Sequence, residues 1–265
     1  MLLSDPDVVR TLNERVVAYW ESVRPVPKVT IDFGDGRVLH RTLGGNTVML
    51  LCLPDGRVLD AFPGIYAPRD FLPALERSLA FAADFRDEAF VAWHRERATQ
   101  AVAAERIRIT TSKAFVESPL LEALGMAQRA LPAAPAPARA AASDRPAPAR
   151  AAAPDPLANP QDAFHRLSAR IEDVSKGAAT VERLRRSYLR EGVPRTPEQI
   201  GREAVELDSR TNTWLVRPAV HLFFVTQGRP VPREECVRAI FREVLHVPVD
   251  DPYLGLADAL VPGTP

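Results

Sequence analysis

The chain has 265 residues, enough for two domains with a sizeable core each, and its hydrophobic (46%) and charged (26%) fractions are those of globular proteins. Thirty-four basic residues balance thirty-four acidic ones, so the formal net charge is zero. This balance argues against a dedicated nucleic-acid or anionic-membrane binder, because such proteins depend on a basic surface.

Helix and strand patterns alternate in the first part of the chain. Asp5 and Pro6 predict a helix start, with an N-cap residue followed by proline at the first helical position. Residues 16–20, VVAYW, are short and β-prone, and they predict a buried parallel strand. VTIDF and RVLHRT flank the turn at 34–36, and VMLLCL and RVLDAF flank the turn at 54–56. Each pair predicts a β-hairpin.

The patterns that follow are helical up to a segment rich in proline and alanine. A helix is expected from Pro68, and others over about 86–104 and 118–130. Residues 131–160 then hold eight of the 25 prolines and almost no large apolar side chain. Such a segment buries too little surface to offset its ordering entropy, so a disordered linker is expected. The sequence therefore predicts two modules, 1–130 and 161–265, that need not touch.

The second module has only helical patterns. Helices are expected over 161–176, from Pro197 after a capping box, over 218–227 with Gly228 as the end, and from Pro232 to about His246. No motif is recognised in this half, and a small all-α domain is predicted.

Residues 4–82 resemble a thioredoxin-like domain from its second helix onward. The stretch 4–23 is similar to the helix after the active-site loop of that family and its next strand. The stretch 44–79 is similar to the closing strand, turn, strand, glycine and helix. The resemblance implies an α/β thioredoxin-like domain that lacks the first strand and its CxxC dithiol. Where the family has a cis-proline, this chain has Gly45, Asn46 and Thr47.

The chain itself shows no catalytic constellation. Cys52 lies in an apolar strand pattern, where burial would make its thiol inert, so it is only a low-ranking redox candidate. Cys236 follows two glutamates, which disfavour a thiolate. The five histidines lack zinc spacing, and no phosphate loop or GxSxG motif occurs. Neither a metal nor another cofactor is expected. Whether the chain is an enzyme stays open at this point, and a non-catalytic role is favoured.

These features favour a non-catalytic protein that acts in protein–protein association, scaffolding or self-association. Gly45, Asn46 and Thr47, with Ile65 and Tyr66 beside them, form the candidate binding loop. One alternative is a thiol-disulfide oxidoreductase whose cysteines lie upstream of Met1 or on a partner. A second is regulatory nucleic-acid binding by the helical half, which the neutral charge makes unlikely. A cytoplasmic protein is expected, because the sequence has no secretory signal and no apolar run of about eighteen residues.

Overall fold

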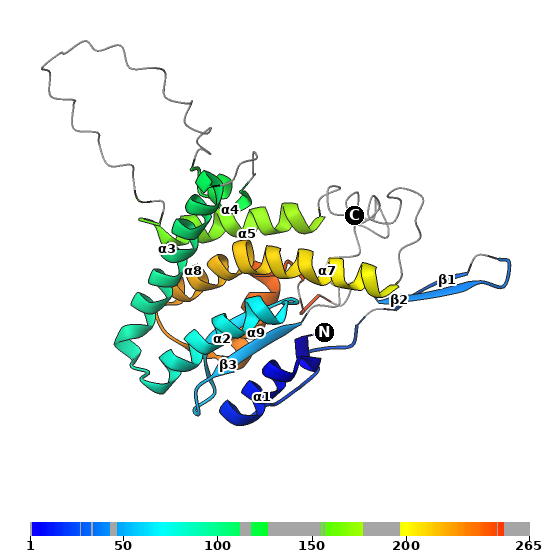
Figure 1. Ribbon diagram of the computed structural model, residues 1–265, viewed down its shortest axis with the longest axis horizontal. Coiled ribbons are helices and arrows are strands. Elements are labelled where there is room, and N and C mark those ends of the chain that lie inside the picture. Colours follow the sequence, from blue (N-terminus) through cyan, green and yellow to red (C-terminus); the bar gives the residue numbers. More distant parts are fainter. Residues whose placement is uncertain are drawn as a thin grey trace, which may run out of the picture.

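The chain is mostly helical and carries a small antiparallel sheet in the computed structural model (Figure 1). The structure describes residues 2–26, 28–32, 34–42, 47–111, 118–126, 155, 157–176, 197–247 and 249–251. The linker prediction for 131–160 thus falls almost wholly outside the described residues. Within them, no helix has both the length and the apolar character that a membrane crossing requires.

The N-terminal helix begins where the sequence predicts. After a short 3-10 turn at Leu2–Ser4, α1 spans Pro6–Arg15, and the Asp5 carboxylate accepts hydrogen bonds from the first free N–H groups of the helix. The predicted strand at 16–20 is wrong, since this stretch has no regular structure and leads into an irregular segment that reaches residue 26. A β-prone run forms a strand only where a neighbouring strand offers its backbone groups, and among the described residues none pairs with it.

Both predicted hairpins are present. β1 (Lys28–Asp32) pairs antiparallel with β2 (Val38–Thr42), and β3 (Val48–Cys52) pairs antiparallel with β4 (Arg57–Pro63). Their turns use glycines with positive φ, such as Gly56 at 83°, a conformation that side chains disfavour. The first hairpin is a separate two-stranded sheet. The second is extended by β5 (Val231–Pro232), which the sequence did not predict, in the order β3-β4-β5.

The remaining elements are helices at the expected places, although α4 is shorter than predicted. They are α2 (Pro68–Ala83), α3 (Asp87–Thr111), α4 (Pro119–Ala123), α5 (Pro160–Lys176), α7 (Pro197–Thr211), α8 (Arg217–Gln227) and α9 (Arg233–Ala239). A π-helical turn, Asn212–Val216, precedes α8, and another, Ile240–Val244, follows α9. α8 ends at Gly228, whose φ of 71° is the left-handed cap predicted for it.

The two halves of the chain share one hydrophobic core. Phe90 of α3 packs edge-to-face against Phe224 of α8, and Phe164 of α5 contacts Phe223. β4 contributes Val58 and other side chains to the same cluster. The two halves, which the sequence left free to lie apart, are thus in contact, and described helices of the second half pack against β4.

A smaller second cluster lies between α1, β4 and α2. It contains Val8 of α1, Phe62 of β4 and Phe71 of α2, all buried. Side chains of β3 pack against both clusters, Met49 against the smaller one and Val48 and Leu50 against the shared core. The strand thus carries apolar side chains on both of its faces.

Candidate functional site

The structure places only part of the predicted binding loop at the surface. Gly45 and Asn46 lie outside the described residues, whereas Thr47 is exposed and its carbonyl oxygen accepts a 2.7 Å hydrogen bond from the Gly64 amide. Ile65 is 45% exposed. Tyr66 is buried between Phe62 and Phe71, so its assignment to a binding surface is wrong.

The loop after β4 is held from the second half of the chain. The Asn212 side-chain amide donates to the Ile65 carbonyl at 2.8 Å, and the Ser209 hydroxyl accepts from the Ala67 amide at 2.8 Å. Gly64 has a φ of 84° and lies so close to Asn212 that a Cβ atom would clash with it. These contacts fix the loop against α7 and its π-helical end.

The two cysteines are free thiols. Cys52 was expected to be buried, but it is exposed and lies directly after a register shift, beyond which it pairs with Val58. Partial desolvation raises the pKa of its thiol, against a smaller opposite effect of Arg233. Cys236 is buried, and burial raises its pKa. Both thiols are therefore protonated at neutral pH and poor nucleophiles.

The most polar region of the interior joins β4 to α8. The Asp60 carboxylate receives two hydrogen bonds from the Arg217 guanidinium, at 2.7 and 2.8 Å. Its other donors are the Ser78 hydroxyl at 2.5 Å and the Ala61 amide at 2.8 Å. Burial alone would raise the pKa of Asp60, but the Arg217 charge and hydrogen bonds lower it overall.

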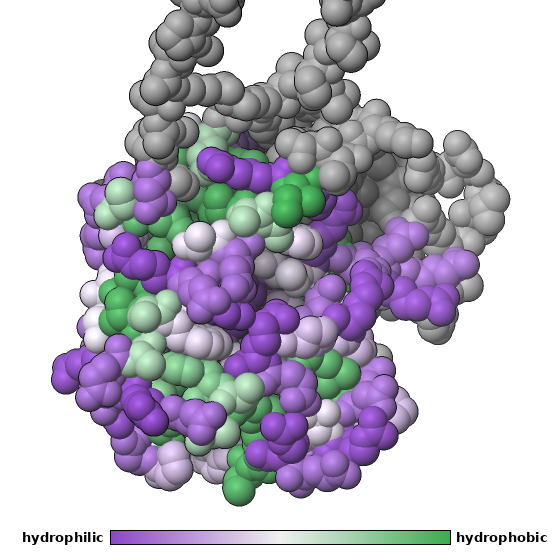
Figure 2. Space-filling model, turned by 60° about the vertical axis from the view of Figure 1, so that its left-hand side comes forward, coloured by the Kyte–Doolittle hydropathy of each residue, from purple (hydrophilic) through white to green (hydrophobic). Residues whose placement is uncertain are grey.

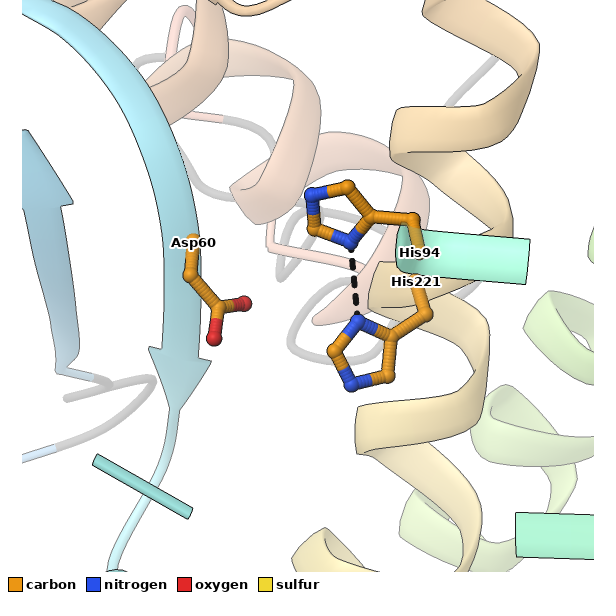
Figure 3. Close-up of side chains that lie close together, drawn as sticks. All are labelled: Asp60, His94 and His221. Atoms are coloured by element: carbon orange, nitrogen blue, oxygen red, sulfur yellow. Dashed lines mark hydrogen bonds between the residues drawn. The ribbon is translucent and has the colours of Figure 1, made fainter. Parts of the chain in front are cut away.

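Two histidines from different helices meet beside this ion pair. His94 of α3 and His221 of α8 approach with 2.9 Å between their Nδ1 atoms, and Figure 3 shows both rings facing Asp60. His94 Nε2 lies 3.1 Å from the Leu59 carbonyl oxygen, which can only accept, so Nε2 carries the proton. His94 Nδ1 must then accept from His221 Nδ1–H. Burial lowers the pKa of His94 to about 3 and that of His221 well below its usual value, so both rings are neutral at pH 7.

This buried polar cluster (Asp60, Ser78, His94, Arg217 and His221) has the residue types of a metal centre, but two of its three possible ligands, Asp60 and His94, are already fully hydrogen-bonded. Ligand atoms of Asp60, His94 and His221 lie within 4.8 Å of one another. However, Asp60 already accepts four hydrogen bonds, which fill its lone pairs, and both nitrogens of His94 are engaged. The adjacent Arg217 charge would also repel a cation. We conclude that the cluster holds the two halves of the chain together.

Sequence reasoning missed this cluster, although a signal was present. Asp60 interrupts the apolar run of β4. Arg217 directly precedes the apolar run of α8, and His221 lies within it. Charged residues in buried elements need partners, so opposite charges in two apolar runs predict a pair.

Comparisons of the chain with family models, with curated proteins and with solved structures found no match.

Exposed apolar side chains occur in several places on the described surface, and one continuous stretch has the most exposed of them. Figure 2 shows hydrophobic residues in several places on one face of the molecule, among hydrophilic ones. This stretch directly follows α1. Its side chains are 99% exposed at Val17, 78% at Tyr19 and 82% at Trp20. A 2.7 Å ion pair between Glu21 and Arg233 ties this stretch to the start of α9, a helix that contacts β3.

Proposed function

We propose that the protein acts without catalysis, by binding another polypeptide at an edge surface formed by Val17, Tyr19 and Trp20 together with the outer edge of β3. The observation that carries this proposal is the exposure of two adjacent aromatic side chains, 78% for Tyr19 and 82% for Trp20. Each of these side chains can bury about 150–250 Å² in a contact. Tyrosine and tryptophan are also the residues most enriched at binding hot spots.

The strand beside this stretch supports the same proposal. β3 is the outer strand in the order β3-β4-β5, and no described strand pairs with its other edge. Strands with apolar side chains on both faces are typical of sheets whose two faces are both covered. The VMLLC sequence of β3 has this character, yet Val48, Met49, Leu50 and Leu51 are only half-buried. An added strand would remove them further from water, as in recognition by strand addition.

The thioredoxin-like resemblance is part of the proposal. It is supported by the antiparallel pairing of β3 with β4, by Gly64 at a φ of 84°, and by α2 beginning at Pro68. The irregular structure at 16–20 does not support it. A scaffold of this kind without a dithiol would serve binding. A cytoplasmic setting stays a prediction from the sequence.

A peptide-display library of extended apolar sequences, panned on the full chain, tests the proposal. We expect enriched peptides whose affinity falls at least tenfold in the Tyr19→Lys/Trp20→Lys double variant. The control is Ile107→Lys, which places a lysine on an exposed apolar position of α3, where the side chain is 62% exposed. Peptides that bind the double variant as well as the control, or a library with no enriched peptide, would contradict the proposal.

A further inference from the structure

The pairing of β3 with β4 determines which of its backbone groups face outward. The Gly64 amide donates to the Thr47 carbonyl, so Thr47 and Gly64 form a hydrogen-bonded pair of the antiparallel ladder. Such pairs alternate along a strand. Met49 and Leu51 therefore direct their N–H and C=O groups to β4, whereas Val48 and Leu50 direct theirs to the outer edge. The Leu53 amide donates to the Arg57 carbonyl, so Leu53 also faces β4 and Cys52 directs its groups outward. Val48, Leu50 and Cys52 thus present three donors and three acceptors on this edge.

These outward groups are self-complementary. When two copies of β3 are placed antiparallel, Val48 of each copy faces Cys52 of the other, Leu50 faces Leu50, and six hydrogen bonds form across a two-fold axis at Leu50. No other register between two identical edges pairs the outward groups of all three residues. We propose that two copies of the chain associate through the outer edges of their β3 strands in this register, with Tyr19 and Trp20 of each copy against the start of the other copy's β3.

The position of the aromatic residues fits this arrangement. Arg233 pairs with Glu21 and also lies close enough to Cys52 to lower the pKa of that thiol, so the exposed stretch runs near the C-terminal end of β3. In an antiparallel pair, the C-terminal end of one strand lies beside the N-terminal end of the other. Tyr19 and Trp20 therefore lie near Val48 of the second copy.

Charge and area favour a second copy as the occupant. The edge surface contains no charged side chain, and the chain has no net charge, so two copies meet no long-range repulsion. The two aromatic side chains of each copy would bury roughly 300–500 Å². A standard interface needs about 800 Å² per partner, and Val17 and the β3 side chains can supply much of the difference.

A cysteine at the two-fold axis tests the register. Facing residues of a hydrogen-bonded antiparallel pair have Cα atoms about 5.5 Å apart, within the range that a disulfide can bridge. We expect Leu50→Cys in a Cys52→Ser background to form a covalent dimer in oxidised glutathione, at least tenfold faster than Val38→Cys in the same background. Val38 lies on the separate hairpin and is 49% exposed. Equal rates for the two variants would overturn the proposal.

The mass in solution supplies the second test. Size-exclusion chromatography with light scattering should give twice the chain mass for the wild type and for Ile107→Lys, and the single chain mass for Tyr19→Lys/Trp20→Lys. This inference rests on the proposed function, but different results would contradict the dimer and the proposed function. A wild-type monomer at all concentrations that still binds apolar peptides would overturn the dimer and leave the proposed function standing.

Discussion

Replacing Arg217 with methionine removes one charge of the buried ion pair and keeps most of the side-chain volume. Asp60 then loses two of its four hydrogen bonds and stays buried beside two neutral histidines. Breaking a buried pair by removing one partner costs about 3–5 kcal/mol. This cost is a large fraction of the 5–15 kcal/mol by which native proteins are usually stable. We therefore expect Arg217→Met to fold marginally.

Urea unfolding followed by circular dichroism measures this loss. With a slope of about 2–3 kcal/mol per molar urea, the midpoint should fall by about 1–2 M. Asp60→Leu combined with Arg217→Met removes both charges and should recover most of the loss, because apolar replacement of a whole buried pair is often neutral. Arg37→Met, which breaks a solvent-exposed pair with Asp35, should leave the midpoint unchanged. An unaltered midpoint in Arg217→Met would refute the claim that this pair joins the halves.

Three further predictions follow from the interior and the thiols. The pKa of His94 is lowered to about 3 in the folded chain, so the unfolded chain binds more protons below pH 6.5, and His94 alone should lower stability by about 2 kcal/mol between pH 7 and pH 5. His221, whose pKa is also lowered, should add to this loss, and equal urea midpoints at the two pH values would contradict both effects. Residues 1–130 alone should aggregate in light scattering, because the helices that cover the sheet are absent, and a stable monomer would show that the shared core is dispensable. The chain should not catalyse insulin reduction by dithiothreitol above a no-protein control, and turnover that disappears in Cys52→Ser would reverse the assignment.

The local features of the fold were predictable from the sequence, because short-range chemistry specifies them. Glycines at the hairpin turns, the Asp5 cap and Gly228 after α8 each satisfy a requirement of a few neighbouring residues. The failed strand at 16–20 has the composition of a strand, but pairing depends on a partner that composition does not specify. Cys52 is exposed and lies directly after a bulge, and the apolar pattern around it reveals neither.

The long-range contacts could not be placed from one sequence. Asp60 and Arg217 are 157 residues apart, and His94 and His221 are 127 apart. Apolar runs show that such residues need partners, but not which partner each one finds. β5 has two residues and no strand pattern of its own, and it exists because β4 offers an edge. The exposed edge surface could not be predicted, because the apolar pattern does not show which of its residues the fold leaves uncovered.

The amide exchange rates of β3 test the proposed binding surface most directly. Met49 and Leu51 direct their amides to β4 and should be protected from hydrogen–deuterium exchange at every protein concentration. The outward amides of Val48 and Leu50 should exchange fast in dilute protein and become protected when the edge is occupied, by a second copy at high concentration or by a selected peptide. Fast exchange at Val48 and Leu50 under conditions where the chain is demonstrably bound would contradict binding at this edge.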